Sequence, residues 1–214
     1  MYISVRLRQV GNMDDEQRTL AIEEAAYAVL AERGYKGASM LAIAKRARVS
    51  NETLYARYAN KAGLFATLVR RNSDALARQL DGAVADGRDP LAALMAAGSL
   101  LYELLTSERV VLLNRAAAAD VADSGTLGRA LAEGGRERIA PKLIALVEAA
   151  ADRGVVDLRS QTPEEATEIF LGVLLAEHPV RRIIGSAELP EAGAGERRAE
   201  RATDCLVRLF APVT

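Results

Sequence analysis

The stretch SMLAIAKRARVSNETLYARYANK, residues 39–61, predicts two short helices joined by a tight turn. Ser39 can cap the first helix, because its hydroxyl accepts an otherwise unpaired backbone N–H. Ser50 can cap the second in the same way, and Leu54 with Tyr58 forms its i, i+4 apolar pair. A helix of about two turns is not stable alone, so tertiary packing must hold the second one in place. The apolar residues that share one face of the first helix are Met40, Ile43, Ala44 and Ala47.

Positive charge is concentrated on this stretch and on the six residues before it. From Arg33 to Lys61 the sequence has seven Lys and Arg residues against one acid, Glu52, which gives a local charge of +6. The whole chain carries −1, so the remainder carries −7. Charge alone would favour a solvated surface, but on a helix-turn-helix it predicts a basic surface that contacts nucleic acid.

Residues 17–67 resemble the DNA-binding domain of the TetR family of bacterial transcriptional repressors. The matching segments are AVLAERGYKGASM, IAKRARVS and TLYARYANKAGLF. The resemblance implies a homodimeric repressor that binds a near-palindromic double-stranded DNA operator and is controlled by a small-molecule effector. The residues that fit the family pattern in the last segment are Thr53, Leu54, Tyr55, Tyr58, Lys61 and Leu64.

The same resemblance implies a set of DNA-binding residues. Thr53, Tyr55 and Lys61 are expected to hold phosphates, and Ser39 to anchor its helix to the DNA backbone. Side chains expected at bases or nearby phosphates are Asn51, Glu52 and Arg57. The full expected set is Ser39, Arg48, Ser50, Asn51, Glu52, Thr53, Tyr55, Arg57 and Lys61.

Two residues in the head depart from the family pattern. Arg48 stands where many members have Gly, so a positive φ there would cost about 1 kcal/mol while adding a cation near phosphate. Glu52 stands where a small residue is frequent. Its carboxylate can accept a hydrogen bond from cytosine N4, or it can simply face solvent.

Composition predicts an all-α fold, since Ala and Leu dominate and no segment alternates β-branched residues. We expect an N-terminal arm at 1–13, a three-helix head at 14–60 and a helical effector-binding and dimerisation body at 61–214. The arm is either mobile or a minor contact to DNA. Pro141 predicts a kink or break in the body, and the segment Thr162 to Glu165 predicts a capping box.

Residues of the body suggest where an effector and a second copy would bind. The segment FLGVLLAEHPVRRIIG looks like the C-terminal body of an AcrR-like or AefR-like branch. Met95, Tyr102 and Asn114 are expected to meet the effector, although core packing explains Met95 equally well. Little charge lies between residues 90 and 102, which favours a largely apolar effector. Packing in the core of the monomer is the alternative for the residues expected at the dimer interface. These residues are Phe170, Val173, Leu174, Val180, Ile184, Leu206, Leu209 and Phe210.

The sequence favours a protein without catalytic, metal or cofactor chemistry. The single His178 and the single Cys205 provide no metal cluster or nucleophilic triad, and no Gly-rich phosphate loop is present. Cys205 is expected to fill the core, with a redox sensor as the alternative. The chain has no evident leader or membrane span, so we expect a soluble cytoplasmic protein. Two other functions stay open: a helical small-molecule-binding protein that has lost DNA binding, and a helical enzyme.

Overall fold

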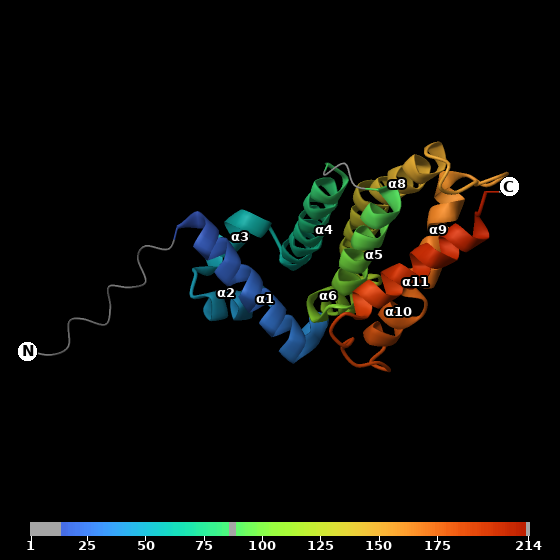
Figure 1. Cartoon of the computed structure of the whole chain (residues 1–214). Helices are drawn as coiled ribbons and strands as arrows, with labels where there is room; N and C mark the ends of the chain where they lie inside the picture. The colour runs from blue at the N-terminus through green and yellow to red at the C-terminus, as the bar shows by residue number, and fades with distance from the viewer. Residues whose placement is uncertain (1–13, 86–88, 213–214) are drawn as a thin grey trace, which may run out of the picture. The chain divides into compact units, whose positions relative to one another are not determined.

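The computed structural model describes residues 14–85 and 89–212, and every regular element in that part of the chain is a helix (Figure 1). The all-α prediction is therefore confirmed. The chain divides between Leu68 and Val69 into two compact units, here called the head and the body. The predicted arm at 1–13 lies outside the described residues. In chain order the helices are α1 (Asp15–Gly37), α2 (Met40–Ala47), α3 (Asn51–Tyr58), α4 (Lys61–Ala85), α5 (Pro90–Thr106), α6 (Glu108–Asp120), α7 (Thr126–Ala132), the π-helix η1 (Glu133–Ile139), α8 (Ala140–Asp152), α9 (Pro163–Leu175), α10 (His178–Ile183) and α11 (Ala194–Leu209).

The head is built from α1, α2, α3 and the first turns of α4. A capping box between Asp14 and Gln17 starts α1, and its regular winding stops at Gly34, whose φ of 65° lies in the left-handed region. Tyr35 follows and is buried. Its ring meets Phe65 edge-on, with the ring centroids 5.7 Å apart. This aromatic contact fixes the end of α1 against the start of α4.

Side-chain caps start α2, α3, α4, α5, α6 and α9, and the sequence predicted those of α2, α3 and α9. Ser39 accepts a hydrogen bond from the backbone N–H of Ala42 at 3.2 Å, and Asn60 accepts one from that of Gly63 at 2.8 Å. Each cap satisfies a backbone donor that the helix itself leaves unpaired. The other side-chain caps are those of Ser50, Asp89, Ser107 and Thr162.

Helix α5 is the centre of the body core. It contacts α6, α8, α9, α10 and α11, and about half of its residues are buried. Gly98 permits the closest of these approaches, because a Cβ at that position would lie 2.8 Å from Phe170 and 3.3 Å from Ala199. Small residues at such a crossing let neighbouring helices pack closely.

Two breaks interrupt the body helices. The π-helix η1 ends just before Pro141, where the sequence predicted a kink or break. Proline removes a backbone donor and clashes with the preceding turn, so regular winding is displaced there. The second break was not predicted: Ala176 has φ 42° and ψ −131°, which ends α9, and α10 then begins at His178.

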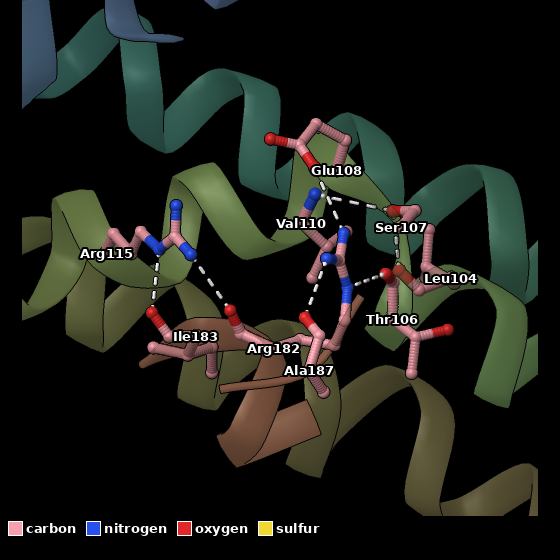
Figure 2. A network of polar contacts seen from close by, with 9 residues as sticks. All are labelled: Leu104, Thr106, Ser107, Glu108, Val110, Arg115, Arg182, Ile183 and Ala187. Carbon is pink, nitrogen blue, oxygen red and sulfur yellow. Dashed lines mark hydrogen bonds and ion pairs between the residues drawn. The ribbon is translucent and has the colours of Figure 1, made fainter. Parts of the chain in front are cut away.

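Two arginines fasten α10 to the junction of α5 and α6 (Figure 2). Arg182 is only 7% exposed, donates to the carbonyl of Thr106 at 3.1 Å and pairs with Glu108 at 3.0 Å. Arg115 donates to the backbone carbonyls of Arg182 and Ile183 at the end of α10. Both guanidinium groups therefore satisfy carbonyls that helix ends leave without partners.

Among the described residues, no single helix is long and apolar enough to cross a membrane. The neighbours α5 and α6 reach that length and composition only as a pair, across a bend of 59°.

Candidate nucleic-acid interface and ligand cavity

Helix α3 is held by its cap and by two buried side chains. Ser50 accepts the backbone N–H of Thr53 at 3.0 Å, and the two hydroxyl oxygens lie 2.8 Å apart. Leu54 and Tyr58 are buried, which fixes the rotation of the helix. The side chains that this rotation leaves exposed include Asn51, Glu52 and Tyr55. A short, firmly seated helix with an exposed polar and aromatic face has the form of a recognition helix for the major groove.

Arg48 adopts the left-handed conformation that the family pattern suggested for the turn. It has φ 57° and ψ 38°, and its N–H donates to the carbonyl of Ala44 at the end of α2. Its side chain is exposed, beside the start of α3. The position therefore combines a conformation suited to Gly with a cation placed to meet phosphate.

Replacing Arg48 by Gly is expected to stabilise the protein and weaken its binding to all DNA. Relief of the left-handed strain should raise the free energy of unfolding by about 0.5–1 kcal/mol. Loss of one phosphate contact should reduce the slope of log affinity against log salt by about 0.9. Arg48→Ala is the matched control, because it removes the same charge and keeps the strain. If urea denaturation gave the two variants equal free energies of unfolding, the inference of backbone strain at position 48 would be wrong.

Arg57 and Lys61, both expected at DNA, have partners inside the head. Arg57 pairs with the carboxylate of Asp15 and donates to the hydroxyl of Thr19 at 2.6 Å, so it ties α3 to α1. Lys61 donates to the carbonyl of Tyr35 at 2.8 Å, and its ammonium lies 4.2 Å from the centroid of the Tyr35 ring. Both cations therefore help to position α3 and α4, and their contacts to DNA stay a prediction.

A basic concavity between α1 and α2 was not singled out by the sequence pattern. It has a volume of about 480 Å³ and includes Ser39 at the start of α2. Arg46, at its edge, pairs with Glu32 of α1. Arg33 and Lys45 also line it and are exposed, which adds positive charge beside α2. Only the fold brings Arg33 next to α2, although its place in the charge cluster was a usable signal.

The body contains a largely apolar cavity of about 590 Å³, within the range of sites for small organic molecules. Its walls come from α4, α5, α6, α7, η1, α8 and α9. The lining residues are Val69, Asn72, Ser73, Leu76, Leu101, Leu104, Leu105, Val110, Leu113, Leu131, Gly135, Ile139, Ala140, Leu143, Ile144, Glu164, Thr167, Glu168, Leu171 and Leu175.

The three residues expected at the effector do not line this cavity. Met95 is exposed, and Asn114 donates to the carbonyl of Val110 in its own helix. Tyr102 is buried on a different side of α5, where it borders a smaller hollow of about 310 Å³. Met95 and Tyr102 belong to α5 and Asn114 to α6, helices that also wall this cavity, but helical spacing does not reveal which stripe meets a void and which meets α11.

Tyr102 takes part in a polar cluster with His178 and Arg198. Its hydroxyl and His178 Nδ1 share a hydrogen bond, and the Arg198 guanidinium lies 5.4 Å from the centroid of the Tyr102 ring. Burial raises the pKa of Tyr102, partly offset by Arg198 and Arg197. Burial also lowers the pKa of His178, and the positive charges of Arg198 and Arg181 lower it further.

The depressed pKa of His178 predicts a loss of stability on acidification. The unfolded state, with a His pKa of about 6.5, binds a proton that the folded state resists, so stability rises with pH through this region. The stability that neutral His178 contributes is complete above about pH 6.5, and it is lost as the pH falls through the pKa that His178 has in the folded state. We expect His178→Gln to flatten the change in unfolding free energy between about pH 7.5 and 5.5. An unchanged pH dependence in urea denaturation would count against this role.

The predicted dimer residues divide into two groups. Phe170, Leu174, Leu206 and Phe210 are buried in the core of the single chain, which corrects their placement at an interface. The members left exposed are Val180, Ile184 and Leu209, at 58%, 70% and 49%, and Val173 is half-buried. Cys205 is also exposed, so the prediction that it fills the core is wrong.

Comparisons with known proteins agree with the sequence resemblance in both units. The model of bacterial regulatory proteins of the tetR family matches residues 22–68, and the model of the AefR-like transcriptional repressor C-terminal domain matches residues 92–212. Comparison with the curated proteins gives no significant match.

Solved structures share the fold over nearly the whole chain. A TetR-family regulator from Mesorhizobium loti MAFF303099 has a TM-score of 0.76 at 22% identity, covering 93% of this chain and 99% of the other. A TetR transcriptional regulator from Agrobacterium tumefaciens has a TM-score of 0.68 at 26% identity, covering 92% of this chain and 95% of the other. The flavonoid-responsive regulator FrrA has a TM-score of 0.65 at 26% identity, covering 93% of this chain and 100% of the other.

Proposed function

Because this chain belongs to the TetR family of transcriptional regulators, with its DNA-binding domain in the head, we propose that it is a repressor released from DNA by a small molecule. In this proposal it binds a palindromic operator in the cytoplasm as a homodimer. The observation that carries the proposal is the seating of α3: a cap and two buried side chains fix a helix whose exposed face presents Asn51, Glu52 and Tyr55.

The electrostatics of the head support binding to the DNA backbone. Arg48 at the end of α2 and the basic concavity that includes Ser39 at its start put positive charge along this helix. Such cations bind phosphates of any sequence and set the register of the protein on DNA. The exposed residues of α3 then supply the sequence preference, through hydrogen bonds to base edges.

The apolar cavity supports control by a small molecule. FrrA, one of the similar structures, is named as responsive to flavonoids, so a regulator of this fold has a small organic effector. In the proposal the effector occupies the body cavity and binds more tightly to a DNA-incompetent state. A preference of about 1–3 kcal/mol would weaken operator binding by the matching factor of roughly 5 to 150.

Exposed apolar residues support a homodimer. Val180 and Ile184 of the α10 region and Leu209 of α11 expose large hydrophobic side chains on elements that Arg182 and Arg198 fix to the core. Burying such residues against a second copy is favourable, and two-fold symmetry would present two α3 helices to a palindrome.

Replacing Asn51 by Ala tests whether α3 reads sequence. We expect affinity for the operator to fall by about 1–3 kcal/mol and affinity for random DNA to stay the same, since a base contact carries sequence information. Arg48→Ala should instead lower the affinity for operator and for random DNA alike. Competition binding with operator and scrambled duplexes, measured by fluorescence anisotropy, separates the two patterns. Equal losses on both duplexes for Asn51→Ala would remove α3 from sequence recognition.

A further inference from the structure

Helix α3 carries an acidic side chain on the part of its surface that lies away from the head. At about 100° per residue, Leu54 and Tyr58 define the buried stripe of the helix, and Ala56 lies on the opposite side. Glu52 precedes Ala56 by one turn and lies about 140° from the buried stripe. Both residues are exposed. Because Ala56 ends in a methyl group, Glu52 is the one of the two that brings a functional group to this face.

The Glu52 carboxylate has no partner within the described residues, unlike its neighbours on one flank of the helix. The Thr53 hydroxyl lies 2.8 Å from that of Ser50. Arg57 pairs with the carboxylate of Asp15 in α1. Glu52 itself forms no ion pair and no side-chain hydrogen bond in the described part of the chain, although its segment of the sequence is strongly basic. The carboxylate is therefore available to a group outside the chain.

A free carboxylate on a face that enters a DNA groove is unfavourable unless it receives a hydrogen bond. Phosphates repel it, and removing it from water without a donor is costly. In the major groove the donors are the amino groups of cytosine and adenine. The adenine amino group lies between two acceptors, its own N7 and the O4 of thymine, and both repel a carboxylate. The cytosine amino group has an acceptor on one side only, the O6 of guanine.

We infer that Glu52 selects a cytosine in each half-site of the operator, with its carboxylate accepting a hydrogen bond from the cytosine N4. This inference rests on the proposed function and names the base that α3 reads at this position. Guanine and thymine present acceptor oxygens there, which face the carboxylate with charge of the same sign. Glu52 therefore excludes the wrong bases as well as binding the right one. The same charge weakens the attraction of the head to DNA of any sequence.

Selection from a random-sequence duplex library by the full chain tests the inference. The unaltered protein should recover a palindrome with one cytosine fixed in each half-site. Replacing that cytosine by another base in both half-sites should lower the affinity by about tenfold or more. Replacing it by 2-pyrimidinone, which is cytosine without the 4-amino group, should cause a similar loss, because the donor to Glu52 is then missing.

Variants at position 52 assign the preference to the carboxylate. A glutamine amide binds the N6 and N7 of adenine together, so Glu52→Gln should change the selected cytosine to adenine and keep the rest of the palindrome. Glu52→Ala should accept any base at that position. Both variants should bind random-sequence DNA severalfold more tightly at low salt, because they lack the charge that phosphates repel.

The structural alternative is that Glu52 only stabilises the N-terminus of α3, as an acid in the first turn of a helix does. Glu16→Gln is the matched control, because Glu16 is also exposed and is also the second residue of its helix, α1. This variant should select the same sequence as the unaltered protein. A merely structural role predicts similar losses of stability in urea for Glu16→Gln and Glu52→Gln, with sequence selection unchanged in both.

The outcomes separate this inference from the proposed function. If the unaltered protein selects a sequence without a fixed cytosine, Glu52 does not read that base and the inference is overturned, while the proposed repressor stands. The same holds if Glu52→Gln and Glu52→Ala keep the cytosine, or if the 2-pyrimidinone duplex binds with full affinity. If the unaltered protein selects no sequence at all, the proposed function fails and the inference fails with it.

Discussion

Replacing Gly63 by Ala is expected to abolish specific DNA binding. A Cβ at Gly63 would lie closer than 3.0 Å to the backbone carbonyl oxygen of Tyr58, a separation that real Cβ atoms essentially never show. Because the obstructing atom is backbone, the turn between α3 and α4 must move. Overpacking of this kind costs about 1–3 kcal/mol, and the movement would tilt α3 away from the geometry that its cap and buried residues impose.

Gly82→Ala is the matched control, since Gly82 lies in the same helix and a Cβ there meets nothing within 4 Å. That variant should gain about 0.5–1 kcal/mol in unfolding free energy and keep full affinity for DNA. Urea denaturation and operator anisotropy on both variants give the comparison. Full affinity in Gly63→Ala would show that the turn tolerates the extra atom and that α3 is not positioned by it.

Replacing Arg182 by Met is expected to cost about 2–3 kcal/mol of unfolding free energy. The methionine fills similar volume but leaves the carbonyls of Thr106 and Ala187 without the donor they now share (Figure 2). Glu108 contributes less to this loss, because its side chain is 59% exposed and regains water. The variant should also loosen α10 and weaken any association through Val180 and Ile184.

Arg208→Met is the control for the loss of one guanidinium, since Arg208 forms an exposed i, i+4 pair with Asp204. Its unfolding free energy should change by less than about 0.5 kcal/mol. A double-mutant cycle with Glu108→Gln should assign only about 1 kcal/mol to the ion pair. A loss from Arg182→Met no larger than from Arg208→Met would contradict the structural role of the buried network.

Local chemistry made the helix starts predictable. Ser39, Ser50 and Thr162 satisfy backbone donors only three residues away, so sequence spacing alone contains the contact. The left-handed turn at Arg48 was readable because the family pattern places Gly there. Gly34 and Pro141 likewise marked real interruptions, since their backbone restrictions act wherever they stand.

Contacts between distant residues were not predictable in the same way. Arg57 meets Asp15 and Thr19, and Lys61 meets the Tyr35 carbonyl, across 26 to 42 residues of sequence. Nothing in the spacing of the cations distinguishes these partners from a DNA phosphate. Ala176 also ends α9 without a Gly or Pro to mark it, so the separate helix α10, with the exposed Val180 and Ile184, was not predictable from the sequence.

The dimer and effector residues were hard to predict where one periodic pattern served two surfaces. Phe170 and Leu174 repeat at helical spacing because they pack on α5 and α11, and an interface would produce the same repeat. The cavity depends on seven helical elements together. On α5 the cavity is lined by Leu101, Leu104 and Leu105, and other apolar residues around the same helix pack in the core. Hydrophobicity alone therefore could not separate residues that line the cavity from residues that pack in the core.

The central claim is that the head reads a specific DNA sequence. Fluorescence anisotropy of the purified chain with DNA from upstream of its own gene, beside a scrambled duplex, at about 0.05 and 0.2 M salt, tests it most directly. The account predicts tighter binding to one duplex and a steep loss of affinity for both with added salt. If the two bind equally, selection from random-sequence DNA follows. A selection that recovers no preferred sequence would contradict the claim and leave a helical protein that binds small molecules and does not read DNA.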